Sequence, residues 1–149
     1  MITIFHWDIP RWLQNIGGLT NPLFVDYFEV FANVLFENFG SKVDTWITMN
    51  EPFNFCTQGY GVNPTWAPNI SSPGVGEYLC GHYMLLAHAR AYRLYRKKYF
   101  KKFGGKVGIT AAFIFRVRIQ PEKTAIEHNS TDWNGLRVQY SVKLEDIRK

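Results

Sequence analysis

Along the 149-residue chain, short apolar runs alternate with longer segments in which apolar residues recur at regular intervals. Three short runs, at residues 1–5, 44–49 and 106–115, are rich in the apolar, β-branched and aromatic residues that favour buried strands. Between them, apolar residues recur at helical spacing over residues 21–40 and about 77–103. The order strand, helix, strand, helix, strand predicts an α/β protein with a parallel sheet and right-handed crossovers.

The residues at the expected helix ends agree with this prediction. Asn21-Pro22 is typical of a helix start, and both Gly40 and the pair Gly104-Gly105 are typical of helix ends. The first helix should pack an apolar stripe against the sheet, and this stripe consists of Phe24, Phe28, Phe31 and Leu35. The second helix should bury one side, which carries Met84, Ala87, Ala91, Leu94 and Tyr95.

Residues 50–76 contain four prolines and several glycines, which predicts a long connecting loop, and loops of this length are usually functional. Two full helices cannot cover both faces of a parallel sheet, and three strands cannot close a barrel of eight. The pattern therefore fits part of a larger α/β protein better than a complete small domain. A chain that opens inside a strand at Met1 suggests the same.

Composition and charge narrow the function classes. Apolar residues make up 46% and charged residues 19%, which excludes a disordered polyelectrolyte, and no run of about 18 apolar residues suggests a membrane-spanning helix. Eight bases lie between Arg90 and Lys106, and such a block can bind nucleic acid. However, these cations fall mostly in the last turns of a helix, where they complement the helix dipole on a solvated face. No nucleic-acid or membrane partner is therefore expected.

The cysteines, acceptor sequences and histidines carry weaker signals. Cys56 and Cys80 have neither a CxxC nor a metal-ligand spacing, so a disulfide and two buried thiols both stay open. Asn69 and Asn129 each begin an N-glycosylation acceptor sequence, which favours secretion, although the N-terminus shows no signal peptide. Three histidines lack the i, i+4 spacing of a helical metal site, namely His82, His88 and His128. They are interpreted as structural or surface residues.

The strand ends carry the candidate chemistry, because parallel α/β folds bind ligands at the carboxyl ends of their strands. His6-Trp7-Asp8 follows the first strand and Asn50-Glu51-Pro52 follows the second. Hydrogen-bonding groups beside an indole suit a sugar, which presents hydroxyl groups and an apolar C–H face. Glu51 is the candidate general acid, and Pro52 is expected to hold it in an extended conformation. A capping or salt-bridged Glu is the alternative.

The segment Thr48-Met49-Asn50-Glu51-Pro52 resembles the TxNEP motif of glycoside hydrolase family 1, the group of β-glucosidases, lactase-like enzymes and myrosinases. Other segments resemble the family in the same order, beginning with its HWDxPxWL segment at residues 5–13 and continuing through residues 21–40, 59–61, 66–68, 76–82, 87–92 and 106–109. The resemblance covers about residues 1–120 and is closest to insect-type secreted members. Residues 121–149 are interpreted as a diverged C-terminal tail.

The resemblance implies an incomplete (β/α)8 TIM barrel, in which the three strands are the third to the fifth. It implies retaining hydrolysis of terminal β-D-glycosides, without a metal or organic cofactor, in which Glu51 is the general acid/base. Asn50 would bind the 2-hydroxyl of the sugar, His6 a neighbouring hydroxyl, and Trp7 would shape the pocket. The family's nucleophile lies in a Glu-Asn-Gly motif, and this tripeptide does not occur in the chain.

Strict alternation would turn Asn50 and Glu51 to opposite faces of the sheet, so regular strand geometry should end near residue 49. Without the nucleophile, the isolated chain is expected to show little or no turnover. One alternative is a catalytically inactive carbohydrate- or partner-binding fragment. Another is a chain that does not fold alone, because its strand edges and apolar helix faces are open. Trp12 and Trp66 either line the approach to the leaving group or plug the fold, and no oligomeric state is assigned.

Overall fold

The computed structural model describes residues 1–114 and 137–142, with side chains for residues 1–111. η1 and η2 are 3₁₀ turns, and η3 is a π-helical turn. The elements follow the chain in the order β1 (Ile2–Phe5), α1 (Arg11–Asn15), η1 (Gly18–Thr20), α2 (Leu23–Phe39), η2 (Gly40–Lys42), β2 (Thr45–Asn50), α3 (Pro52–Tyr60), α4 (Gly76–Leu94), η3 (Tyr95–Tyr99), α5 (Phe100–Phe103), β3 (Lys106–Ile114) and β4 (Arg137–Val142).

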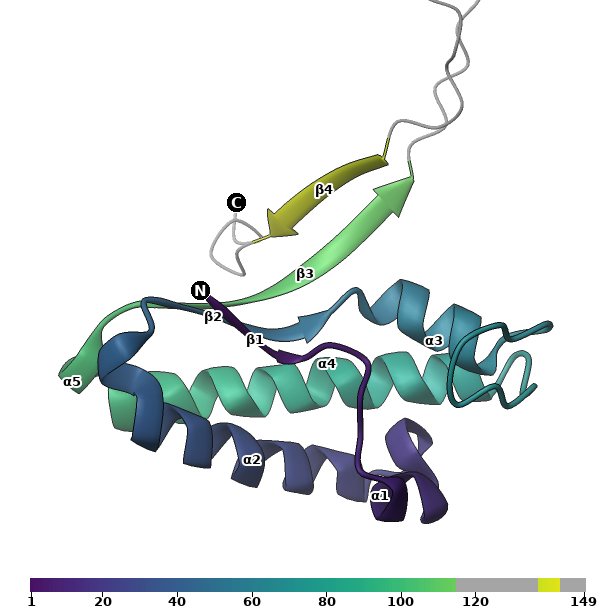
Figure 1. Cartoon of the computed structure of the whole chain (residues 1–149), viewed down its shortest axis with the longest axis horizontal. Coiled ribbons are helices and arrows are strands. Elements are labelled where there is room, and N and C mark those ends of the chain that lie inside the picture. Colours follow the sequence, from purple (N-terminus) through teal and green to yellow (C-terminus); the bar gives the residue numbers. More distant parts are fainter. Residues whose placement is uncertain (115–136, 143–149) are drawn as a thin grey trace, which may run out of the picture.

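The sheet has the strand order β1-β2-β3-β4. β1 pairs in parallel with β2, and β2 pairs in parallel with β3, which confirms the predicted βαβαβ arrangement. β4 lies antiparallel beside β3 (Figure 1). It falls within residues 121–149, which were interpreted as a diverged tail and for which no strand was predicted. The described part of the chain is therefore an α/β structure with three parallel strands.

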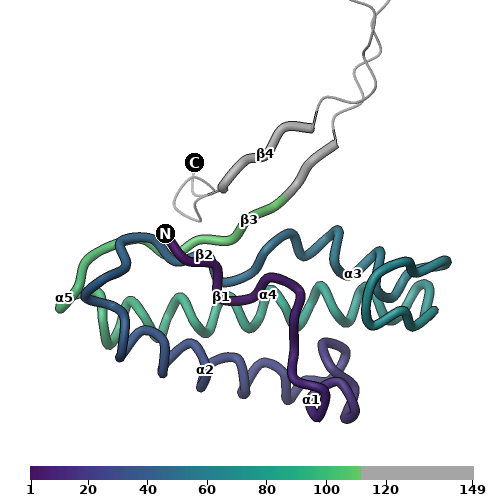
Figure 2. The backbone as a smooth tube through the Cα atoms, viewed as in Figure 1, coloured from purple at the N-terminus to yellow at the C-terminus, as the bar shows by residue number. Residues whose placement is uncertain are grey.

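The core lies between the sheet and two long helices. α2 and α4 pack against each other and run along one face of the sheet formed by β1 and β2 (Figures 1 and 2). Phe36 of α2 contacts the rings of Trp46 in β2 and Tyr95 in η3, at centroid distances of 5.1 and 4.9 Å. These three side chains are almost completely buried, so they join helix, strand and helix into one core.

The apolar stripe of α2 differs in part from the prediction. Phe24 and Phe28 are buried, but Phe31 is 50% exposed, and the buried row continues through Ala32 and Phe36. The prediction for Phe31 was wrong because α2 packs along a row of residues four apart, the usual ridge of a packed helix. Phe31 lies beside this row and lines an apolar groove of about 480 Å³ next to β1.

Residues 52–60 form α3, so the prediction of a loop throughout residues 50–76 was wrong for this part. Pro52 occupies the first turn of α3, where a missing N–H costs no helical hydrogen bond. The connection that follows is tied back to the end of α3 by backbone hydrogen bonds. The N–H of Ile70 donates to the carbonyl of Gly59, and the N–H of Ser72 donates to that of Tyr60, both at 3.0 Å.

The helix expected over residues 77–103 consists of α4, η3 and α5 in succession. The side predicted to be buried is buried at Met84, Ala87, Ala91 and Tyr95, and Leu94 packs against the core while partly exposed. Gly104 and Gly105 end the helix with φ of 66° and 79°, backbone angles that residues other than glycine rarely adopt. Within the described residues, no helix has the length and apolar character needed to cross a membrane.

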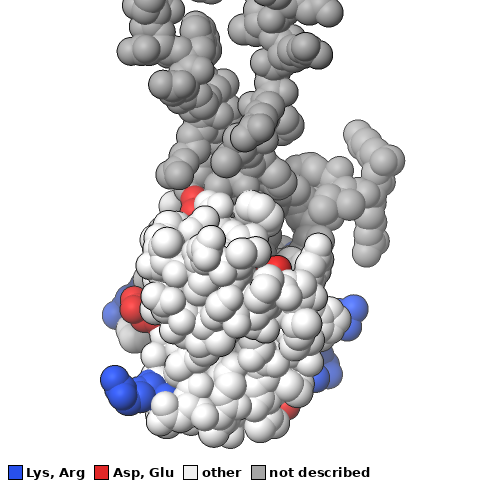
Figure 3. All heavy atoms as spheres, turned by 90° about the vertical axis from the view of Figure 1, so that its right-hand side faces the viewer, with Lys and Arg blue, Asp and Glu red and all other residues white. Residues whose placement is uncertain are grey.

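The basic segment lies on the outer side of the α4–η3–α5 helix. Arg90 pairs with Asp26 and Glu29 of α2, and the side chains of Lys97, Lys98, Lys101 and Lys102 are exposed. This exposure agrees with the interpretation as a solvated helix face. Figure 3 views the molecule from the carboxyl ends of β1 and β2, where uncharged residues predominate and Lys and Arg stand at the edges.

Candidate active site

The end of β2 contains an irregularity that bears on the site. Ile47 pairs with Gly108 of β3 and Asn50 pairs with Thr110, so β2 advances three residues while β3 advances two. The strand runs to Asn50, but its pairing register shifts one or two residues earlier, close to the predicted end of regular geometry. An extra residue of this kind re-aims the side chains that follow it.

Glu51 stands at a sharp turn from strand to helix. Its backbone has φ 46° and ψ 62°, in the left-handed region, so the predicted extended conformation was wrong. The physical reason is that α3 begins at the next residue. The N–H of Glu51 still donates to the carbonyl of Thr110 in β3 at 2.8 Å, and its carbonyl already accepts the N–H of Phe55 at 3.0 Å. A non-glycine residue with positive φ is uncommon and often marks a functional position.

The carboxylate of Glu51 is half-buried and has one hydrogen-bond donor on α3. The Nδ2 of Asn54 donates to its Oε2 at 3.0 Å. Glu51 occupies the N-cap position of α3, but its side chain makes no capping hydrogen bond. Among the described residues it also makes no salt bridge. Neither form of the alternative interpretation, a capping or a salt-bridged Glu, is therefore seen in the described part of the chain.

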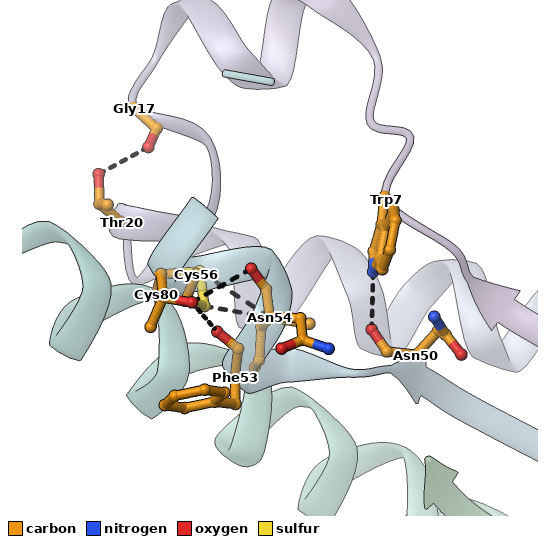
Figure 4. Close-up of a disulfide and its surroundings, with 10 residues drawn as sticks. Trp7, Gly17, Thr20, Asn50, Phe53, Asn54, Cys56 and Cys80 are labelled. Carbon is orange, nitrogen blue, oxygen red and sulfur yellow. Dashed lines mark hydrogen bonds between the residues drawn. A yellow bond between two sulfur atoms is a disulfide. The ribbon is translucent and has the colours of Figure 1, made fainter. Parts of the chain in front are cut away.

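His6, Trp7 and Asn50 meet at the carboxyl ends of β1 and β2. The indole Nε1 of Trp7 donates to the backbone carbonyl of Asn50 at 2.9 Å (Figure 4). The Nδ2 of Asn50 lies 3.3 Å from Nε2 of His6. His6 is exposed, Trp7 is half-buried and Asn50 is buried. The structure thus brings three of the four predicted site residues into direct contact, and Glu51 follows Asn50 in the chain.

Trp66 is a neighbour whose role the sequence left open. Its ring lies 4.6 Å from that of Trp7, centroid to centroid, at an interplanar angle of 31°. Trp12 lies elsewhere, with its ring edge-on to that of Tyr27 of α2 at 5.0 Å. An open hollow of about 390 Å³ adjoins Trp7 and is lined partly by Phe55. Sequence spacing could not have paired Trp7 with Trp66, because 58 residues separate them, and these include α1, α2, β2 and α3.

Cys56 and Cys80 form a disulfide that joins α3 to α4, with 5.6 Å between their Cα atoms. Figure 4 shows this bond close to Asn54, which like Cys56 lies on α3, the helix that begins directly after Glu51. The open question of the cysteines is thereby answered. The acceptor residue Asn69 is exposed, whereas Asn129 lies outside the described residues.

The histidines of α4 have different environments. His88 is buried, and its Nδ1 lies 2.6 Å from Oγ1 of Thr48, while His82 is exposed. Burial lowers the pKa of His88 to about 4. The part of the chain that the structure describes contains no group of three or more residues arranged to hold a metal ion. His128 lies outside that part.

These features define an α/β protein whose candidate site lies at the carboxyl edge of a parallel sheet, the edge where barrel enzymes bind their substrates. The family model described as Glycosyl hydrolase family 1 matches residues 1–139, and the chain belongs to this family. The resemblance found in the sequence is thereby confirmed. The match continues past residue 120, and the division into barrel and diverged tail at that residue stays a prediction.

The known proteins with similar sequence or structure include myrosinases and a β-glucosidase. Myrosinase 1 of Brevicoryne brassicae is 44% identical over 115 residues, which are 77% of this chain and 24% of that protein. The structure of an aphid myrosinase matches with a TM-score of 0.70 and 45% identity, over 73% of this chain and 23% of that one. A β-glucosidase from Trichoderma harzianum matches with a TM-score of 0.68 and 40% identity, over the same shares. The chain thus spans about a quarter of the length of each of these three relatives.

Proposed function

We propose that the chain supplies the third, fourth and fifth strands of a (β/α)8 barrel and the acid/base half of a retaining β-glycosidase site. The observation that carries this proposal is the contact of His6, Trp7 and Asn50 at one sheet edge, directly before the strand-to-helix turn at Glu51. Family membership and the β-glucosidase among the similar structures support a terminal β-D-glycoside as the substrate.

Glu51 is the proposed general acid/base. In retaining hydrolysis one carboxylic acid protonates the leaving oxygen, and a second carboxylate, roughly 5–5.5 Å away, attacks the sugar. The first carboxylate then takes a proton from the water that releases the sugar. Because the amide of Asn54 donates to Oε2, the proton of the acid form belongs on Oε1. Asn54 thus fixes which oxygen faces the leaving group.

The sugar would be held by the three side chains beside Glu51. Asn50 would bind the 2-hydroxyl, His6 a neighbouring hydroxyl, and Trp7 would shape the pocket with its ring. The contact of Nδ2 of Asn50 with Nε2 of His6 restricts both side chains before the sugar arrives. Because such restriction lowers the ordering cost of binding, it supports a preformed pocket edge. No metal or organic cofactor enters this scheme.

The nucleophile is expected to come from outside the 149 residues, because no Glu-Asn-Gly motif occurs among them. The same observation favours a second function, a carbohydrate- or partner-binding chain without turnover. The isolated chain tests this second function, and a graft into a complete barrel tests the first. Measurable glucose binding without hydrolysis of an aryl β-glucoside is expected for the binding function, whereas hydrolysis by the isolated chain would contradict the absence of a nucleophile.

A graft tests the acid/base role. Residues 1–114 replace the matching segment of the Trichoderma harzianum β-glucosidase, and Glu51→Gln is compared with the matched control Glu29→Gln on the outer helix α2. With a poor leaving group, turnover of Glu51→Gln should fall about 10²- to 10⁴-fold, because the leaving oxygen needs a proton. With a dinitrophenyl leaving group the loss should be far smaller. Equal losses for both leaving groups would contradict the acid/base assignment.

We also propose that the chain is a secreted glycoprotein. The disulfide between α3 and α4 and the exposed acceptor residue Asn69 support this, since disulfides persist in oxidising compartments. Expression in a secreting eukaryotic cell should yield a form that loses mass on enzymatic deglycosylation. Asn69→Gln should remove one glycan, and Asn129→Gln tests the second acceptor sequence. Secretion of a form without glycan would contradict the glycosylation proposal.

A further inference from the structure

Two buried polar side chains lie behind the irregular end of β2. Thr48 and His88 are 0% and 4% exposed, in a layer otherwise filled with apolar side chains. The hydroxyl of Thr48 donates to the carbonyl of Gly108 in β3 at 3.1 Å and lies 2.6 Å from Nδ1 of His88 in α4. One hydroxyl therefore links β2 with the neighbouring strand and with the helix that covers it.

These contacts fall where the register shifts. Gly108 is the residue paired with Ile47, the last partner before the shift, and Asn50 is the first residue paired after it. An extra residue in a strand leaves part of the ladder without its usual hydrogen bonds, so side chains often take over those groups. The Thr48 hydroxyl makes such a side-chain hydrogen bond to the carbonyl of Gly108.

The hydrogen-bond roles of the pair can be assigned from its geometry. The carbonyl of Gly108 can only accept, so we assign it the proton of the Thr48 hydroxyl, and Nδ1 of His88 then donates to Thr48. Nε2 of His88 is buried and has no hydrogen-bond partner within the described residues. An unprotonated nitrogen tolerates this position better than a buried N–H without an acceptor. The pair is therefore satisfied with a neutral imidazole.

We propose that Thr48 and His88 are positioning residues that hold the irregular end of β2 and thereby orient Asn50 and Glu51. The proposal rests on the proposed function only for its catalytic consequence. In a regular strand Thr48 and Asn50 would share one face. Here Thr48 contacts α4, whereas Asn50 contacts His6 beyond the end of β1, and this difference needs the extra residue.

The first experiment reads the position of Asn50 in the full chain without any sugar. The indole N–H of Trp7 donates to the carbonyl of Asn50, so its hydrogen-exchange rate, measured by NMR on the ¹⁵N-labelled chain, reports on this contact. Thr48→Val should raise the rate by about tenfold, the worth of one hydrogen bond, relative to the amide of Ala32 in the core. Thr48→Ser, which keeps the hydroxyl, should stay within about twofold of the wild type.

Two further variants complete this design. Thr45→Val, at the first residue of β2, is the matched control and should leave the Trp7 exchange rate unchanged. His88→Leu removes the donor to Thr48 and should reproduce the effect of Thr48→Val. Should Thr48→Val fail to fold, Thr48→Ala serves in its place. Exchange at Trp7 that rises only as much as exchange at Ala32 would overturn the proposal, because global destabilisation then explains it.

The second experiment uses the graft into the β-glucosidase. Thr48→Val should lower kcat about tenfold with little change in KM, because positioning of Glu51 acts on the reaction step, and Thr48→Ser should restore it. Unchanged kcat in an active graft would overturn the positioning role. If Glu51→Gln instead shows no dependence on the leaving group, the acid/base assignment fails while the exchange result at Trp7 still stands.

Discussion

Acidification should destabilise the folded chain through His88. Burial lowers the pKa of this imidazole from 6.5 to about 4, whereas unfolding exposes it to water and restores the ordinary pKa. Each pKa unit corresponds to about 1.4 kcal/mol, so the folded chain should lose about 3 kcal/mol of unfolding free energy across this range. For a chain of this size that is a large part of a typical total of about 5–15 kcal/mol.

The direction follows from the protons bound in each state. Between about pH 4 and 6.5 the unfolded chain holds a proton on His88 and the folded chain does not, so the free energy of unfolding rises with pH. Above about pH 6.5 neither state holds this proton, and the contribution of His88 becomes flat. Below about pH 4 both states hold it, and the slope from His88 again disappears.

Urea unfolding at a series of pH values, followed by tryptophan fluorescence, measures this effect. His88→Asn keeps a donor toward Thr48 but does not titrate, so the difference between wild type and variant isolates His88 from the carboxylates. This difference should change by about 3 kcal/mol between pH 7 and 4. His82→Asn removes an exposed imidazole from the same helix and should keep the wild-type slope. A difference that stays constant over this pH range would refute the reasoning.

The further predictions concern stability and are measured by urea or thermal unfolding. Cys56→Ser opens the disulfide between α3 and α4, whose 24-residue separation predicts a loss of about 3 kcal/mol, and reduction of the wild type should match it. Gly105→Ala should cost about 1–2 kcal/mol, because φ is +79° and a Cβ would meet a backbone carbonyl at 2.7 Å. Gly81→Ala, in open space on α4, should instead stabilise by up to about 1 kcal/mol. Phe28→Ala should cost about 3–5 kcal/mol, since the ring is 5% exposed, whereas Phe31→Ala at 50% exposure should cost far less.

Local patterns were sufficient to predict the three parallel strands and the two long helices. The start of α2 is an example, because Oδ1 of Asn21 accepts the N–H of Leu23 at 2.9 Å, as its position before Pro22 predicts. Phe31 shows the limit of such patterns. Spacings of three and four residues both suit a helix, and only packing against the sheet selects the row through Ala32 and Phe36.

The sequence predicted which candidate residues would lie together, but it did not predict the backbone conformation beside them. The order of the strands brought His6, Trp7 and Asn50 to one edge, as expected from their places after β1 and in β2. The left-handed conformation of Glu51 was missed, because Pro52 disfavours a right-handed helical residue before it but does not tell whether a helix starts after it. α3 was missed for a related reason, since proline and glycine were taken as loop signals.

The proposed acid/base half-site is braced by contacts within this chain. The backbone of Glu51 is tied to β3 through Thr110, and its carboxylate is tied to α3 through Asn54. α3 is in turn fixed to α4 by the disulfide, and α4 is linked to β2 through His88 and Thr48. Together these links run from Glu51 through α3 and α4 back to β2, the strand that precedes Glu51. The local geometry of the acid/base therefore does not depend on the residue that would attack the sugar. Transfer of residues 1–114 into a related barrel should therefore carry this geometry with it.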